Sequence, residues 1–239
     1  MIAMLLFLSV IAGISGWWLS QQRLTAKPWL EEGVLGGFPD TGVSPRPAVK
    51  TGLGVFLAVA GCLFSLLISA YVMRVDLASS SIVDKAALPI PNLLWLNTGV
   101  LVLSSAALQW AWVEARRGQT NGVRAGLLAG AIATLVFVAG QLLAWRQLTQ
   151  AGYFVASNPA TSFFYLLTGA HGLHVLGGLV ALGRTASKVW RGVAMAQVRL
   201  SVELCAIYWH FLLLIWLIVF GLIMGWADDL VSICRALVT

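Results

Sequence analysis

The sequence has 239 residues, of which 59% are apolar and 10% are charged, and its mean hydropathy is +0.88. This composition excludes an ordinary soluble domain and predicts an all-α, polytopic membrane protein. The apolar runs are unbroken, which also excludes a transmembrane β-barrel, because barrel strands alternate apolar and polar residues.

Six apolar stretches approach the length of about 20 residues that a helix needs to cross a bilayer. In chain order they cover residues 1–22, 51–73, 92–113, 125–145, 159–183 and 204–227. We therefore expect an N-terminal transmembrane helix at 1–22, a cytoplasmic loop at 23–50, a five-helix core at 51–227 and a short C-terminal tail at 228–239. No Lys or Arg precedes the first stretch, so it is interpreted as a membrane helix rather than a cleaved signal peptide.

The basic residues divide unequally between the two sides of this six-helix arrangement. Four lie on one side, namely Arg74, Lys85, Arg146 and Arg235. Eleven lie on the other side, in the loops after the first, third and fifth stretches: Arg23, Lys27, Arg46, Lys50, Arg116, Arg117, Arg124, Arg184, Lys188, Arg191 and Arg199. The positive-inside rule then predicts a multi-pass protein of a bacterial-type cytoplasmic membrane with both termini on the non-cytoplasmic side. Topology and contact with anionic lipid explain the net charge of +6, so no nucleic-acid partner is expected.

Few ionisable side chains interrupt the apolar stretches, and each is a candidate functional residue because burial of a charge in lipid is costly. They are His171 and His174 in the fifth stretch, with Glu203 and His210 at the sixth. At about 100° per residue, positions seven apart return to nearly the same face of a helix, so Glu203 and His210 form one stripe. Trp209 and Trp216 form a second stripe on another face. We expect Glu203 and His210 to meet His171 or His174 in a buried polar network.

Three interpretations of these four residues are weighed. Two histidines could ligate one haem, as in membrane b-type cytochromes. A carboxylate-bridged metal site would need more acidic residues in the helices than the sequence has. A buried hydrogen-bond network that fixes helix packing and holds a lipid headgroup is favoured, with no catalytic residue and no metal ligand in the chain.

Several motifs in order resemble the cytochrome c oxidase subunit III family over about residues 50–226. The run TGAHGLHV at Thr168–Val175, followed by Glu203, by YWHF at Tyr208–Phe211 and by Trp216, resembles the last two helices of that family. Further matches in order are AYVMR at Ala70–Arg74, Asn97 and Thr98 with Ser104 and Ser105, Gln141, and SFF at Ser162–Phe164. The resemblance implies that Arg74, Asn97, Gln141, Trp209 and Trp216 are packing residues.

The same resemblance implies an accessory, cofactor-free subunit of a proton-pumping haem-copper terminal oxidase, which reduces oxygen to water in aerobic respiration. Haem and copper would belong to the partner, catalytic subunit I, and bound phospholipid is expected. The electron donor, cytochrome c or quinol, is not encoded in this chain. The sequence has Ala60, Ala144 and Leu213 where many members carry carboxylates, which counts against a proton-collecting role of the interior and leaves a part for Glu203 in proton uptake open.

Two rival functions stay open from the sequence. A subunit III-like helper of a nitric oxide reductase would keep the fold and change the complex. A membrane transporter would commonly show repeated halves and broken helices, and the two halves of this sequence share no evident motif.

Overall fold

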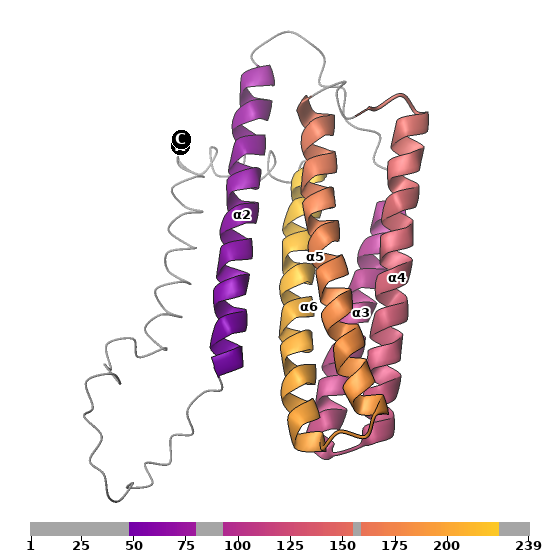
Figure 1. Ribbon diagram of the computed structural model, residues 1–239. Helices are drawn as coiled ribbons and strands as arrows, with labels where there is room; N and C mark the ends of the chain where they lie inside the picture. The colour runs from indigo at the N-terminus through magenta and orange to yellow at the C-terminus, as the bar shows by residue number, and fades with distance from the viewer. Residues whose placement is uncertain (1–47, 80–92, 155–158, 225–239) are drawn as a thin grey trace, which may run out of the picture. The chain divides into compact units, whose positions relative to one another are not determined.

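The computed structural model describes residues 48–79, 93–154 and 159–224. These residues form five α-helices, drawn in Figure 1: α2 (Ala48–Ser79), α3 (Leu93–Arg117), α4 (Thr120–Gln150), α5 (Pro159–Trp190) and α6 (Met195–Ile223). All five are long and apolar enough to cross a membrane. The predicted five-helix, all-α core is therefore confirmed, whereas the predicted helix at 1–22, the tail at 228–239 and all but the end of the 23–50 loop lie outside the described residues.

Each helix extends past the apolar stretch that predicts it. α5 continues from 183 to Trp190, and α6 begins at Met195 rather than at 204. The added turns carry charged residues such as Lys188 and Arg199, which hydropathy assigns to loops. Helical backbone hydrogen bonds satisfy themselves locally, so a helix can leave the hydrocarbon without ending.

Short glycine turns join neighbouring helices at the end of the molecule where α3 and α5 finish. Gly118 between α3 and α4 has φ 76°, and Gly192 between α5 and α6 has φ 71°. These left-handed conformations are accessible to glycine at little cost, so the chain reverses within a few residues. The reversals make α3 antiparallel to α4, and α5 antiparallel to α6.

α3 and α4 pack against each other more extensively than any other pair. Gly126 permits this approach, because a Cβ at this position would lie 2.7 Å from the Ala111 Cβ and 2.9 Å from the Ala107 carbonyl oxygen. Gly140 acts in the same way further along α4, where a Cβ would overlap the side chain of Asn97. Small residues at such contacts are the usual means by which membrane helices approach closely.

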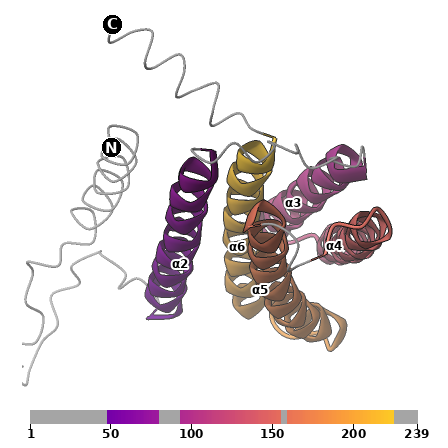
Figure 2. The ribbon, with the colours of Figure 1, turned by 90° about the horizontal axis from the view of Figure 1, so that it is seen from above.

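α6 is the central helix of the described core. It packs against α3, α5 and α2, and Figure 2 shows it between α2 and α3. Its inward stripe carries Trp209 and Trp216, which are fully buried together with Phe137 of α4 at 1% exposure. α2 lies on one flank, where it contacts only α5 and α6 among the closely packed pairs, and Phe64 is its one fully buried side chain among the described residues.

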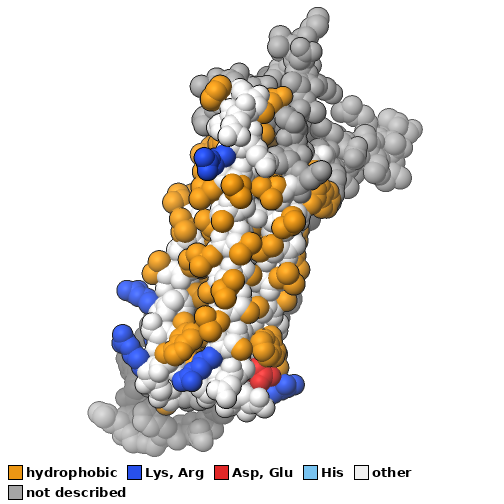
Figure 3. Space-filling view, turned by 90° about the vertical axis from the view of Figure 1, so that its right-hand side faces the viewer, with side chains coloured by type: hydrophobic (Ala, Val, Ile, Leu, Met, Phe, Trp, Pro, Cys, Tyr) orange, Lys and Arg blue, Asp and Glu red, His pale blue; other side chains and the backbone are white. Residues whose placement is uncertain are grey.

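Charged residues gather at the ends of the described helices. Figure 3 shows Lys and Arg side chains at the lower end of one face, with apolar side chains over the middle. The basic residues at this end come from the α3–α4 and α5–α6 turns and from Lys50, whereas Arg74 and Arg146 lie toward the opposite end. This separation agrees with the charge pattern of the sequence, and the assignment of this end to the cytoplasm stays a prediction.

Candidate functional site

His171 lies at the centre of the helix core and is fully buried. Its Nε2 donates to the carbonyl oxygen of Leu212 on α6 at 3.1 Å, since a carbonyl only accepts. The imidazole ring contacts Phe137 of α4 and Trp216 of α6, with ring centroids 5.8 Å and 5.0 Å apart. His171 thereby joins α4, α5 and α6 in one contact.

His174 lies one turn further along α5 and faces α2. Its ring centroid is 5.3 Å from that of Phe64 and 6.4 Å from that of Phe56. Its Nδ1 bonds to the Ala170 carbonyl of its own helix at 2.8 Å, and the Tyr208 hydroxyl donates to the His174 carbonyl at 2.9 Å. His174 of α5 therefore packs against aromatic side chains of α2. The hydrogen bond from Tyr208 links α6 to the same part of α5.

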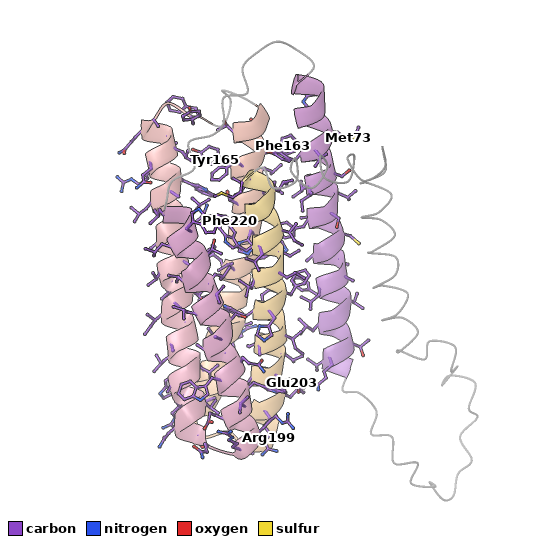
Figure 4. All side chains as sticks on the ribbon, turned by 180° about the vertical axis from the view of Figure 1, so that it is seen from behind. Met73, Phe163, Tyr165, Arg199, Glu203 and Phe220 are labelled. Carbon is purple, nitrogen blue, oxygen red and sulfur yellow. The ribbon has the colours of Figure 1, made fainter. Side chains whose placement is uncertain are left out.

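The expected bond between Glu203 and a histidine is wrong. Glu203 pairs instead with Lys50 at the first turn of α2, with 2.5 Å between Nζ and Oε1. The physical reason is depth: Glu203 lies near the beginning of α6, whereas His171 and His174 lie mid-way along α5. Figure 4 shows Glu203 close to Arg199, at the end where α6 begins. Sequence reasoning missed Lys50 because it was assigned to the preceding loop.

His210 was expected inside the network and is instead exposed on the outside of α6. It bonds to two residues of α3, with Nδ1 2.5 Å from Ser105 Oγ and Nε2 2.9 Å from Gln109 Oε1. The cause is visible on the same helix. Trp209 and Trp216 occupy the inward stripe, so the stripe that carries His210 turns outward.

Two indole N–H groups of α6 donate into the interior, and we call these contacts the indole ladder. Trp209 Nε1 donates to Thr134 Oγ1 of α4 at 3.1 Å, and Trp216 Nε1 donates to Thr98 Oγ1 of α3 at 2.9 Å. Ser104 of α3 adds a 2.8 Å bond to Thr134. Buried indoles usually need such partners, so the ladder fixes the rotation of α6 against α3 and α4. Sequence reasoning did not single out Thr134, although a single Thr in an apolar stretch is a weak signal for a buried hydrogen-bonding residue.

Asn97 and Gln141 connect α3 to α4 beside the Trp216–Thr98 contact of the ladder. Asn97 is 2% exposed, and its Nδ2 donates to the Phe137 carbonyl at 3.1 Å and to Gln141 Oε1 at 3.4 Å. Gln141 Nε2 and His171 Nδ1 are buried and have no hydrogen-bond partner among the described residues. These polar groups lie within the core and face neighbouring helices, and their role as packing residues stays a prediction. Arg74, by contrast, is exposed near the end of α2.

A buried acid at the end of α3 escaped the sequence reasoning, because the apolar stretch was ended at residue 113. Glu114 is 5% exposed and pairs with Arg117 at 2.9 Å. Arg199 of α6 reaches the same end of α3 and donates to the carbonyls of Ala115 and Arg116, each at 2.8 Å. A cation at a helix C-terminus satisfies free carbonyls and complements the helix dipole. Arg199 therefore caps the C-terminus of α3 and attaches α6 to it.

Many family members carry a carboxylate where this chain has Ala60, Ala144 and Leu213, and two of these three positions are buried. Ala60 is 4% exposed and Ala144 is fully buried. A carboxylate at either position would be enclosed by the packed helices and would need a partner there. Within residues 48–79, 93–154 and 159–224, no group of three or more His, Cys, Asp or Glu side chains is placed to hold a metal ion.

Comparisons with known proteins agree with the motifs. A protein-family model described as Cytochrome c oxidase subunit III matches residues 46–228. Cytochrome c oxidase subunit 3 of Thermostichus vulcanus is 32% identical over 179 residues, which are 72% of this chain and 84% of the relative. A Mycobacterium tuberculosis protein named as a probable cytochrome c oxidase subunit 3 is 38% identical over 131 residues, 53% of this chain and 62% of the relative. Cytochrome bo(3) ubiquinol oxidase subunit 3 of Pseudomonas aeruginosa is 24% identical over 172 residues, 72% of this chain and 82% of the relative.

Proposed function

The chain belongs to the cytochrome c oxidase subunit III family, and from that premise we propose that it is the accessory subunit of a proton-pumping haem-copper terminal oxidase. In this proposal it covers one flank of the catalytic subunit I and limits distortion of that subunit during turnover. The chain itself carries out no redox step. Haem and copper are held by the partner, and the electron donor, cytochrome c or quinol, is set by other subunits.

The observation that supports this role most strongly is how the interior polar groups are used. Hydrogen bonds between helices are formed by the indoles of Trp209 and Trp216, by Asn97 and by His171. His174 bonds within its own helix. Side chains committed in this way rigidify a core and specify one packing arrangement. A rigid bundle of this kind is suited to supporting a neighbouring subunit.

Phospholipid binding is the second part of the proposal. α2 presents apolar side chains such as Val59 and Leu66 on its outer surface, at 63% and 72% exposure. The exposed side chains of Arg184, Lys188 and Arg191 lie at the end proposed to be cytoplasmic, where anionic headgroups attract basic residues. Lipid held along α2 would extend the support beyond the protein contacts.

The proposal is tested by purifying the oxidase through an affinity tag on this chain. We expect a haem-bearing catalytic subunit to co-elute, and the isolated chain to show no haem absorbance and no metal by elemental analysis. His171→Phe and His174→Phe should leave the ratio of haem to protein in the complex unchanged. Stoichiometric haem in the isolated chain, lost in either variant, would place a redox centre here and refute the proposal.

A further inference from the structure

Two polar atoms deep in the core have no hydrogen-bond partner among the described residues. They are the amide nitrogen Nε2 of Gln141 on α4 and the ring nitrogen Nδ1 of His171 on α5. Gln141 is 6% exposed and His171 is fully buried, so neither a lipid nor another subunit reaches these atoms. Buried polar groups in stable proteins are almost always hydrogen-bonded, to protein or to ordered water, so both atoms call for a partner inside the core.

The two atoms are complementary in their hydrogen-bond chemistry. The Leu212 carbonyl only accepts, so His171 Nε2 carries the hydrogen of the neutral imidazole and Nδ1 is left as an acceptor. The Phe137 carbonyl fixes the Asn97 Nδ2 group as a donor, so the Gln141 oxygen faces Asn97. The Gln141 nitrogen is then left as a donor. One of the two groups therefore offers a hydrogen and the other accepts one.

The register of α4 and α5 places both groups at the same level of the bundle. Trp145 Nε1 of α4 donates to Thr168 Oγ1 of α5 at 3.2 Å, which aligns these two positions. Gln141 is four residues before Trp145, and it therefore lies one turn deeper on the same face of α4. His171 is three residues after Thr168, one turn deeper on the same face of the antiparallel helix α5. The next turn of α4 carries Phe137, whose ring is 5.8 Å from that of His171.

We infer that one internal water molecule lies between Gln141 and His171, accepts a hydrogen bond from Gln141 Nε2 and donates one to His171 Nδ1. Buried waters typically bridge polar groups that the protein leaves unpaired. A direct bond between the two side chains is disfavoured, because the Gln141 amide is held toward Asn97 on α3 and the imidazole toward Leu212 on α6. The polar site is one helical turn deep, between Trp145 and the Phe137 ring, which suits a single water.

The water completes a chain of hydrogen bonds across the core. The chain runs from Asn97 of α3 through Gln141 of α4, the water and His171 of α5 to the Leu212 carbonyl of α6. It links all four helices α3–α6 at one level. Every protein group in it belongs to this chain, so the inference does not depend on the proposed function.

Solid-state NMR of the full-length chain in lipid bilayers, with isotope-labelled histidine, tests the presence of water at His171. The chain has three histidines, so each ring is assigned from one variant. We expect magnetisation from water to reach the His171 ring despite its burial, and Gln141→Met to lower this transfer at least twofold. Gln147→Met makes the same change at an exposed position near the end of α4 and should leave the transfer at the wild-type value. No transfer to His171 in the wild type, or equal transfer in Gln141→Met, would overturn the inference.

A pair of substitutions tests the bridge through stability. Gln141→Met and His171→Phe each leave the water with one of its two partners, so the thermal midpoint of the double variant should fall by less than the sum of the two single falls. Gln141→Met with His174→Phe is the matched control, because His174 faces α2 and bonds within its own helix, and here the falls should add. Falls that add for Gln141 and His171 as well would overturn the inference.

A density map of the wild-type chain that resolves ordered water gives a check without any variant. We expect one water within hydrogen-bond distance of both Gln141 Nε2 and His171 Nδ1. A direct bond between the two side chains, another protein group on either atom, or a map with no water between them would overturn the inference.

Discussion

The four helices α3–α6 and the flanking helix α2 are held in place by different means. In the most apolar stretch of each helix, 44% of residues are buried within the protein in α6 and 39% in α4, against 11% in α2. The inner helices have close backbone approach at Gly126 and interhelical hydrogen bonds from Trp209 and Trp216. α2 has aromatic contacts around His174 and the Lys50–Glu203 ion pair.

This difference follows from the solvent. Lipid tails are as apolar as leucine side chains, so apolar surface alone gives little reason for two membrane helices to associate. Close packing and polar contacts decide which helices hold together. The inner four helices are therefore expected to resist separation, and α2 is expected to be the first described helix to detach.

The largest effect is expected where α3 and α4 approach most closely. Gly126→Ala would place a methyl group 2.9 Å from the Ala107 carbonyl oxygen, and backbone cannot rotate away as a side chain can. We expect a loss of about 2–3 kcal/mol in the free energy of unfolding, as for other overpacked cores. Gly177→Ala on α5 meets nothing within 4 Å and should be neutral or stabilising by up to about 1 kcal/mol. Unfolding titrations in mixed micelles measure both, and equal effects would contradict close approach as the basis of the inner core.

The next effect concerns the indole ladder. Trp209→Phe removes the bond to Thr134 and part of a fully buried side chain, so we expect a loss of about 1–2 kcal/mol. Trp110→Phe makes the same change at a side chain that is 48% exposed on α3, and should alter stability by less than about 0.5 kcal/mol. If Trp110→Phe cost as much as Trp209→Phe, the ladder would not be what fixes α6.

The smallest effect is expected at the edge of α2. Glu203→Gln breaks an ion pair whose side chains are 28% and 35% exposed, and such pairs contribute about 0.2–1 kcal/mol. Because Glu203 and His210 bond to different helices, Glu203→Gln and His210→Phe should have additive effects on stability. Unfolding of the two single variants and the double variant checks this, and a coupling above about 0.5 kcal/mol would restore the shared network that the sequence suggested.

The sequence predicted the fold better than it predicted the contacts. Helix number in the described part of the chain followed from hydropathy, because a helix must span the hydrocarbon with few charges. The spacing of Glu203 and His210 correctly placed them on a stripe apart from Trp209 and Trp216. Which stripe faces inward could not be read from helical periodicity, since both faces of a membrane helix are apolar enough for lipid. The choice depended on Thr98 and Thr134, which lie 118 and 75 residues away from their indole partners.

Glu114 and Lys50 show a second limit of sequence reasoning. Hydropathy ends a helix at its first charge, although the helix itself continues for another turn or more outside the hydrocarbon. Both residues lie in such turns, and both pair there with a charge of opposite sign. The ends of membrane helices therefore carry polar contacts that a search of the apolar stretches overlooks.

The most direct test of the supporting role is oxygen consumption over successive turnovers by the purified oxidase with and without this chain. The account predicts that the complex stripped of the chain keeps most of its initial rate and then loses activity severalfold faster, and that adding the chain back restores the longer lifetime. An immediate and complete loss of the first turnovers, while the catalytic subunit stays folded and retains its haems, would contradict the account.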